Sequence, residues 1–326
     1  MKVAILCLDQ VFDSAVHIVR DVLGTAARLS PEAAGKRSLV STLTLDGDPI
    51  TTASRQTLAP DGAIGDSRGP DVIVLPGIVA ERGVETLGPL LQGACASRVT
   101  SWLVEQHHRG AEIATACTGT WFIAQTGLLN GFEATTTWHL ASPFRERFPE
   151  VDLQIGKMVT YGNRIRCAGA AMAHMDLALS LVTNLFGGRI SREVASLLLL
   201  DGRSSQAQYM ITEHLQGSSE DFRRIDAWIR EHVGESFAMR DLAKAAGLSQ
   251  RTLARRVWDT TGETPLKLVQ RIRVEKALHL LETTSWSFSE ITFKVGYEEP
   301  ATLRRLIRNL TGRSPSEIRS RSNLDS

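Results

Sequence analysis

Cys117 has the sequence surroundings of a reactive or ligand-binding cysteine. It follows a short apolar, β-rich run, residues 112–116, and precedes a helical pattern that begins near Thr120. At such a sharp strand-to-helix turn we expect the side chain to be exposed over the carboxyl edge of a sheet, beside the amides of a helix N-terminus. Those amides lower the pKa of a thiol and can hold a carboxylate or an oxyanion. Three roles are open to Cys117: nucleophilic catalysis, contact with a bound ligand, or a structural turn.

A second set of residues has the pattern of a nucleic-acid binder, because one motif occurs twice, in residues 242–265 and 291–315. Gly247 and Gly296 lie 49 residues apart, whereas Leu253 and Leu303 lie 50 apart, so one residue is inserted at the second turn. The 50-residue spacing also relates Gly262 to Gly312 and Pro265 to Pro315. Each copy has an apolar helix, a turn glycine and a second helix, which predicts two helix-turn-helix modules for two successive major-groove segments.

The second helix of each copy carries the side chains that we expect at DNA. Ser249 is a predicted helix N-cap. Arginine suits guanine edges and glutamine suits adenine edges, and both can contact phosphates. A solvated helical bundle with charged faces is the alternative, which the repeat in register makes unlikely. The predicted DNA-binding residues are Ser249, Gln250, Arg251, Thr252, Arg255, Arg256, Glu299, Pro300, Thr302, Arg304, Arg305 and Arg308.

Charge is distributed unevenly along a chain that is nearly neutral overall, with 37 basic and 36 acidic residues. Residues 1–220 contain 18 basic and 22 acidic side chains, and the remainder contains 19 basic and 14 acidic ones. The C-terminal third is therefore basic, as expected of a DNA-binding domain.

Short apolar strands alternate with helices in the N-terminal part. The expected strands are residues 1–8, 38–45, 71–75 and 112–116, and the expected helices are residues 16–29, 94–107 and 120–129. This alternation predicts an α/β domain, a flavodoxin-like parallel sheet with helices on both faces, followed by an all-α C-terminal domain. The carboxyl edge of such a sheet is where ligands bind.

The remaining composition indicates a cytoplasmic protein without metal or cofactor. Four cysteines lack paired spacing, which suggests neither a zinc site nor a disulfide framework. No apolar run approaches the length of a membrane span. Residues 1–8 are expected to be a buried strand rather than a secretory signal, because Asp9 and Asp13 follow at once without a small-residue cleavage site. We expect His107 and His108 to lie at a helix end rather than at a metal, and His174 to pack within a helix.

Residues 221–321 resemble the AraC/XylS family of bacterial transcriptional regulators. The resemblance implies a long helix over residues 265–282 that joins the two modules. Tyr297, Leu303 and Phe293 depart from the residue types usual in the family. The matching residues are Leu242, Ala246–Ser249, Arg251–Leu253, Arg255, Gly262–Pro265, Arg273, Ala277, Leu280, Leu281, Glu290, Ile291, Val295–Tyr297, Gly312, Ser314 and Pro315.

The N-terminal part resembles the class I glutamine amidotransferase-like fold in its PfpI/ThiJ branch. The matching segments are residues 71–77, 116–119, 127–131, 134–138, 167–170, 176–179, 205–206 and 208–209. Regulators with this pair of domains sense small metabolites, often amino acids or quaternary amines, so the resemblance implies an effector pocket. Trp138 could offer an aromatic face to a cation. The expected pocket residues are Asp13, Gly77, Ile78, Cys117, Thr118, Trp138, His139 and Ala170.

The groups that would activate Cys117 are altered relative to this family. Thr137 stands where histidine is usual, although His139 would lie on the same side of a strand. The acidic partner of enzymatic relatives would fall at Ala15, with Asp13 two residues away. A cysteine nucleophile needs a base or partner that holds its thiolate, so we predict no catalytic residue and no enzyme activity.

We predict two domains, 1–216 for effector sensing and dimerisation and 217–326 for DNA binding. Residues 186–189 resemble a turn, residues 192–200 an apolar helix or strand, and residues 216–219 a linker.

The sequence as a whole predicts a sequence-specific transcriptional regulator, with activation as the expected outcome. Its expected partners are double-stranded promoter DNA, an amino acid or amine-type effector, RNA polymerase and a second copy of the chain. We expect the protein in the bacterial cytoplasm, and on the nucleoid when it is bound to DNA. Two alternatives stay open: a cysteine-dependent hydrolase or deglycase-like enzyme tethered to DNA, and an effector-independent DNA-binding dimer.

Overall fold

The computed structural model describes residues 2–30, 40–66, 69–80, 83–203, 205–206, 209–210, 219–311 and 314–322. The chain forms two compact units, the first from residues 1–206 and 213–217 and the second from residues 207–212 and 218–326. The boundary that the sequence predicts at residues 216–217 lies outside the described residues, as does Gly312 of the second repeat.

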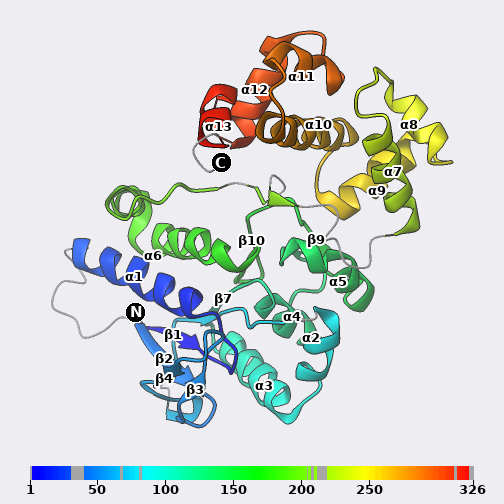
Figure 1. The fold of residues 1–326 in the computed structure, drawn as a ribbon. Helices are drawn as coiled ribbons and strands as arrows, with labels where there is room; N and C mark the ends of the chain where they lie inside the picture. The colour runs from blue at the N-terminus through cyan, green and yellow to red at the C-terminus, as the bar shows by residue number, and fades with distance from the viewer. Residues whose placement is uncertain are drawn as a thin grey trace. The chain divides into compact units, whose positions relative to one another are not determined.

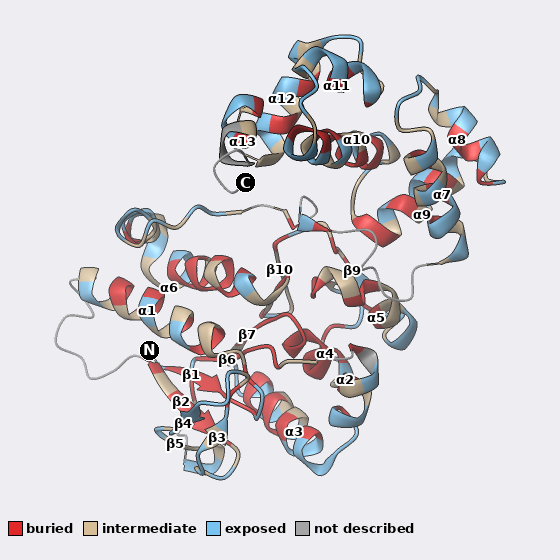
Figure 2. Cartoon of the chain, viewed as in Figure 1, coloured by how far each residue is buried: buried red, intermediate tan, exposed pale blue. Residues whose placement is uncertain are grey.

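The first unit is built on a seven-stranded sheet whose strands are parallel except at one edge, where β10 runs antiparallel to β11. Apolar residues fill its central strands, which are buried on both faces, as a parallel sheet between helices requires (Figure 2). Its order is β10 (Val159–Gly162), β11 (Ile165–Ala168), β7 (Glu112–Ala116), β6 (Val72–Leu75), β1 (Val3–Leu6), β2 (Val40–Thr44) and β5 (Gly62–Ala63).

Helices cover both faces of this sheet, as predicted. α1 and α6 lie together on one face and α3 lies on the other (Figure 1). The helices are α1 (Asp13–Leu29), α2 (Val84–Leu90), α3 (Ala94–His108), α4 (Gly119–Gln125), α5 (Ala141–Arg147) and α6 (His174–Leu197). Two small sheets pair β3 (Ile50–Thr51) with β4 (Thr57–Leu58) and β8 (Glu133–Ala134) with β9 (Asp152–Leu153), and 3-10 turns occupy Ile64–Asp66, Trp138–Leu140 and Ala171–Ala173.

α6 contains the turn that the sequence predicts at residues 186–189. Gly187 has φ 84° and ψ 161°, which interrupts the helix there. A positive φ of this kind favours glycine. The chain then resumes as helix to Leu197, so the predicted helix or strand at residues 192–200 is a helix over most of its length.

The second unit is helical. Its helices are α7 (Glu220–Glu231), α8 (Met239–Ala245), α9 (Gln250–Thr261), α10 (Pro265–Thr283), α11 (Phe288–Lys294), α12 (Pro300–Thr311) and α13 (Pro315–Ser322). Side chains of Ser249, Thr264 and Ser287 cap α9, α10 and α11 by accepting a backbone N–H. α10 begins at Pro265, whose missing N–H costs nothing in a first turn, and it is the predicted long joining helix.

Within the described ranges, no helix is long and apolar enough to cross a membrane. Over the same residues, no group of three or more His, Cys, Asp or Glu side chains is arranged to hold a metal ion.

Candidate functional site

The two helix-turn-helix modules use the same turn. In the first, Gly247 N–H donates to Lys244 O at 3.0 Å and Leu248 N–H donates to Ala243 O at 2.9 Å. In the second, Gly296 N–H donates to Phe293 O and Tyr297 N–H donates to Thr292 O, both at 3.1 Å. This pair of bonds defines a helix C-terminus closed by a left-handed residue, and the two glycines have φ of 71° and 76°.

Packing orients the second helix of each module so that its basic face is outward. Leu253 and Val257 are buried on α9, and Leu303 and Ile307 are buried on α12. Residues four apart share a helix face, so the opposite faces are left to solvent. The exposed predicted residues are Ser249, Gln250, Arg251, Arg255, Glu299, Arg304, Arg305 and Arg308, whereas Thr252, Arg256, Pro300 and Thr302 are half-buried.

Two positions of the outward face are the same in both copies. When the two copies are aligned by their 50-residue spacing, Thr252 corresponds to Thr302 and Arg255 corresponds to Arg305. Arg256 differs, because its Nε lies 3.2 Å from Asp221 Oδ2 on α7. That ion pair holds Arg256 to the neighbouring helix α7. Of the two adjacent arginines, Arg255 is therefore the more available for contact with DNA.

Exposed aromatic side chains near these helices were not predicted from the sequence. Trp258 on α9 is 49% exposed and Phe293 on α11 is 60% exposed. Single exposed aromatic residues are ordinary on a protein surface, and only a contiguous apolar patch marks an interaction site. Their departure from the apolar period of the helices was the signal that could have identified them.

Arg273 on α10 connects the two modules within the second unit. Its Nη1 donates to Gly296 O at 3.1 Å, and its guanidinium lies 5.2 Å from the ring centre of Tyr297 and 5.4 Å from that of Phe237. Phe237 precedes α8 of the first module, whereas Gly296 and Tyr297 form the turn of the second. One cation from the joining helix therefore contacts both modules.

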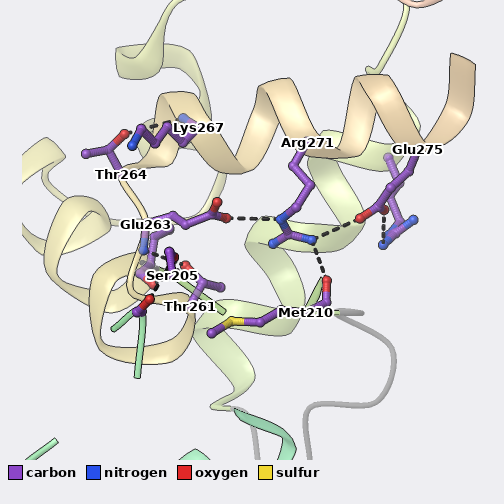
Figure 3. A network of polar contacts seen from close by, with 11 residues as sticks. Ser205, Met210, Thr261, Glu263, Thr264, Lys267, Arg271 and Glu275 are labelled. Carbon is purple, nitrogen blue, oxygen red and sulfur yellow. Dashed lines mark hydrogen bonds and ion pairs between the residues drawn. The ribbon is translucent and has the colours of Figure 1, made fainter. Parts of the chain in front are cut away.

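Arg271, two residues before Arg273 on α10, is the centre of a buried polar network (Figure 3). Its Nε donates to Glu263 Oε2 and its Nη1 to Glu275 Oε1, both at 3.0 Å. Nη1 also donates to the carbonyl oxygen of Met210 at 3.0 Å. Two carboxylates compensate a charge that would otherwise be costly to bury, and Met210 is thereby fixed to α10.

In the first unit, Cys117 lies at the predicted strand-to-helix turn between β7 and α4. Its φ of 58° is left-handed, which is a strained conformation for a residue with a side chain. Neighbouring backbone holds it there: Cys117 N–H donates to Gly169 O at 2.6 Å, and Thr136 Oγ1 donates to Cys117 O at 2.7 Å. Glycine is required beside it, since a Cβ at Gly77 would lie 2.8 Å from Cys117 Cβ.

The predicted exposure and acidity of Cys117 are both wrong. The residue is buried, with 5% of its surface exposed. Burial raises the pKa of the Cys117 thiol to about 11, and hydrogen bonds with Thr118 and Thr137 offset this only in part. Desolvation of the thiolate outweighs the helix N-terminal amides, so Cys117 is a protonated thiol near neutral pH.

The strand predicted through Thr137 and His139 is also wrong, because residues 138–140 form a 3-10 turn. The side chains nevertheless meet: Thr137 Oγ1 lies 3.0 Å from His139 Nδ1. Since Thr137 also hydrogen-bonds to Cys117, the hydroxyl stands between the thiol and the imidazole. His139 therefore does not replace the histidine that a thiolate would need at position 137.

The other predicted pocket residues near this turn come from three parts of the chain. Thr118 Oγ1 accepts from Ile78 N–H at 2.9 Å and donates to Ile78 O at 2.7 Å, and Gly77 O accepts from Phe12 N–H at the start of α1. Trp138 stacks edge-on against His139, with ring centres 5.3 Å apart. Ala170 follows Gly169, the acceptor of the Cys117 amide.

Asp13 lies at the start of α1, where its carboxylate accepts from Ser54 N–H at 3.2 Å. Partial desolvation raises the pKa of Asp13, but hydrogen bonds with Thr52 and Ser54 outweigh it, so the pKa lies below its ordinary value. Ala15, at the position of the expected acidic partner, is fully buried. Asp13 is thus an ionised carboxylate engaged by the loop between β3 and β4.

Gln206, one of the residues that match the family, is a polar residue at this turn that was not among the predicted pocket residues. It is 2% exposed, and its Nε2 donates to Thr135 Oγ1 and to Thr136 O, both at 3.0 Å. Its Oε1 has no hydrogen-bond partner. The run of buried threonines at 135–137 was the available signal, since buried hydroxyl groups need partners.

Sequence relatives carry both units together. The chain is 25% identical to the HTH-type transcriptional regulator CdhR of Pseudomonas aeruginosa over 281 residues, covering 85% of this chain and 80% of that protein. It is 23% identical to the HTH-type transcriptional regulator GbdR of the same species over 281 residues, covering 85% of this chain and 74% of that protein.

Solved structures share the fold of the first unit. A putative transcriptional regulator from Vibrio parahaemolyticus aligns with a TM-score of 0.53 at 20% identity, covering 61% of this chain and 98% of that one. DJ-1beta of Drosophila melanogaster aligns with a TM-score of 0.50 at 21% identity, with the same coverage.

Family profiles agree with this division. Residues 242–321 match a helix-turn-helix domain of the AraC type, and residues 1–184, more than half of the chain, match the DJ-1/PfpI family. The chain belongs to the DJ-1/PfpI family, and its attached AraC-type helix-turn-helix domain makes it a DNA-binding transcriptional regulator.

Proposed function

We propose that this regulator reads promoter DNA with α9 and α12 and adjusts that binding to a small metabolite held at the Cys117 turn. The observation that carries the DNA part is the outward basic face shared by two modules with identical turns. Arg255 and Arg305 occupy equivalent positions on those faces, so each module presents a cation to its own major-groove segment.

The metabolite is bound and not transformed in this proposal. The Cys117 thiol is protonated at neutral pH, and Thr137 separates it from His139, so the turn lacks an activated nucleophile. An amino acid or amine-type compound is the proposed effector class, with the Trp138 ring as a face for its cationic group. Activation of transcription, association with RNA polymerase, a homodimeric state and a cytoplasmic location belong to the same proposal.

Binding of DNA is tested by selecting a site from a random duplex library with the full chain and measuring affinity at fixed salt. We expect a defined site with two contacted segments on one face of the duplex, and affinity that falls steeply as salt rises. Selection of no consensus, with binding that is equal for all sequences, would overturn sequence-specific regulation.

Effector binding is tested by thermal shift of the full chain against amino acids, amines, betaines and small acids. A ligand of the folded state raises the melting temperature by mass action. Recovery of the stabilising compound unchanged supports a sensor, and its conversion supports the hydrolase or deglycase-like alternative. A panel that contains no stabilising compound favours the effector-independent dimer.

A further inference from the structure

Gln206 joins the Cys117 turn to the end of the first unit. The segments that hold Cys117 in its left-handed conformation are Thr136, which donates to the Cys117 carbonyl, and Gly169, which accepts from the Cys117 amide. The Gln206 amide contacts both of them. Its Nε2 donates to Thr136 O at 3.0 Å, and a Cβ built on Gly169 would lie 2.7 Å from Gln206 Cδ.

The amide is fixed in one orientation. Nε2 donates to a carbonyl oxygen, Thr136 O, so the amide cannot flip without placing two acceptors together. Oε1 is then a buried acceptor without a partner. An unsatisfied buried acceptor lowers the stability of the conformation that contains it. The unpaired Oε1 therefore makes the orientation of the Gln206 side chain sensitive to changes in the residues around it.

The chain next to Gln206 is fastened to the same unit at several points. Arg203 binds Asp176 through Nε at 3.1 Å and through its backbone N–H at 2.9 Å. Ser205 Oγ donates to Gly156 O at 2.7 Å, and Gln206 N–H donates to the same carbonyl at 3.2 Å. Gln206 is the last residue of this continuous part of the first unit.

The chain then enters the second unit with another anchor only four residues further. Met210 is 1% exposed, and its carbonyl oxygen accepts from Arg271 at 3.0 Å. Arg271 belongs to α10, the helix that joins the two modules. Residues 206 and 210 are therefore each held, one by the Cys117 turn and the other by the joining helix of the DNA-binding unit.

We propose that Gln206 is the positioning residue through which a change at the Cys117 turn reaches the connector to the DNA-binding unit. The proposal rests on the function proposed above, since a ligand at this turn would act first on the two segments that the Gln206 amide contacts. Loss of the amide contacts removes one of the fastenings at the end of the first unit and loosens residues 205 and 206. The occupied and empty sensor then differ in how tightly residues 203, 205 and 206 are held to the first unit.

The test follows backbone hydrogen exchange of a peptide covering residues 203–210 in the full chain. Gln206→Ala removes the amide, and Gly169→Ala displaces it by steric overlap, so a failure of one variant to fold leaves the other. We expect exchange in this peptide to rise roughly tenfold in both, since the loss of about two hydrogen bonds favours local opening. The matched control is Gln125→Ala, whose Nε2 donates to Leu91 O at 2.7 Å elsewhere in the unit.

Transmission from the turn is tested with Thr136→Val, which removes the hydroxyl bound to Cys117 O and keeps the carbonyl bound to Gln206. We expect Thr136→Val to raise exchange of the 203–210 peptide in the wild-type background and to add nothing in the Gln206→Ala background. Equal increments in both backgrounds would overturn a route through Gln206, as would folded Gln206→Ala and Gly169→Ala variants with wild-type exchange.

DNA affinity of the same variants, measured on the selected site, separates this proposal from the proposed function. We expect Gln206→Ala and Gly169→Ala to change affinity by roughly threefold or more in the same direction, because both disturb the same amide contacts at the end of the first unit. Wild-type affinity in both variants would remove the link to DNA binding. Failure of the wild-type chain to select any site contradicts the proposed function, while the exchange result still decides whether Gln206 fixes the connector.

Discussion

Arg273 Nη1 donates a 3.1 Å hydrogen bond to the carbonyl oxygen of Gly296, so the joining helix holds the turn of the second module directly. The same guanidinium lies near Phe237 of the first module. A carbonyl at a helix end is normally satisfied by solvent or by a local cap. Here the Arg273 guanidinium from α10 donates to the Gly296 carbonyl, so the same side chain contacts both modules.

The two turn glycines should differ in their tolerance of a methyl group. At Gly247 a Cβ meets nothing within 4 Å, so Gly247→Ala adds only the left-handed strain, about 1 kcal/mol. At Gly296 a Cβ would lie 2.8 Å from Val233 O and 2.9 Å from Arg273, so Gly296→Ala should destabilise by roughly 3 kcal/mol or more. Urea unfolding of the full chain measures both, and equal losses would contradict the asymmetry.

Arg273→Lys should destabilise the second unit although it retains the charge. Lysine lacks the planar fork that reaches Gly296 while lying near Phe237 and Tyr297. We expect a loss of about 2 kcal/mol, the contribution of a charged hydrogen bond and its ring contacts. Arg240→Lys is the control, because that side chain is 78% exposed. A wild-type unfolding midpoint in Arg273→Lys would show that charge alone is sufficient.

Arg255→Ala and Arg305→Ala should each weaken DNA binding more than Arg256→Ala does. The first two side chains are exposed, whereas Arg256 is engaged by Asp221 at 3.2 Å. We expect each of the two to lower affinity by roughly 1–3 kcal/mol if it reads a base, or to reduce the salt slope by about 1 if it binds a phosphate. Gel shifts across a salt series distinguish these outcomes. A larger effect of Arg256→Ala would mean that its ion pair opens on DNA.

Cys117 should react slowly with iodoacetamide in the folded protein. Its thiol has a pKa of about 11 against an ordinary 9.0, which leaves roughly a hundredfold less thiolate at pH 8. Cys95 is exposed and should be labelled first. Mass spectrometry of tryptic peptides follows both sites over time. Faster labelling at Cys117 would restore the nucleophile hypothesis.

His174 should make the first unit sensitive to acid. Burial lowers the pKa of His174 from 6.5 to about 4, although its hydrogen bond to Ala171 O raises it slightly. Because the folded-state pKa is depressed, the stabilisation is complete above about pH 6.5 and is lost as pH falls toward 4. At pH 5 the loss is about 2 kcal/mol.

His174→Asn is the variant that tests this, since its amide can keep the donor toward Ala171 O without titrating in this range. Denaturant unfolding at pH 7 and pH 5 should show a smaller pH-dependent loss in His174→Asn than in the wild type. The exposed His17→Gln is the control. An unchanged pH dependence in His174→Asn would assign the acid sensitivity to other groups.

Much of the second unit follows from short-range sequence signals. The glycine at each turn, the serine cap of α9 and the leucines four residues from the next buried position are local features, and the structure confirms the two modules that they predict. β7 likewise ends at Ala116 as the apolar run predicted. Local signals suffice where the neighbours that decide a conformation are close in the sequence.

The surroundings of Cys117 could not be predicted in this way. Its burial depends on Gly77, Thr136 and Gly169, which come from three distant parts of the chain. A short 3-10 turn at residues 138–140 stands where a strand was expected, and Trp138 and His139 pack edge-on there. Gln206 enters the same site from the end of the unit, and its Nε2 donates to residues about 70 positions earlier in the chain. The composition of one segment does not indicate which distant residues will pack against it in the folded chain.

The extra residue between Gly296 and α12 makes the two helix-turn-helix modules differ in the length of their turns. α9 begins three residues after its turn glycine, whereas α12 begins four residues after the equivalent glycine. The two second helices therefore follow their turns differently and are not interchangeable. For the DNA contact proposed above, we expect a binding site with a distinct first and second half, which gives the bound protein a direction along the duplex.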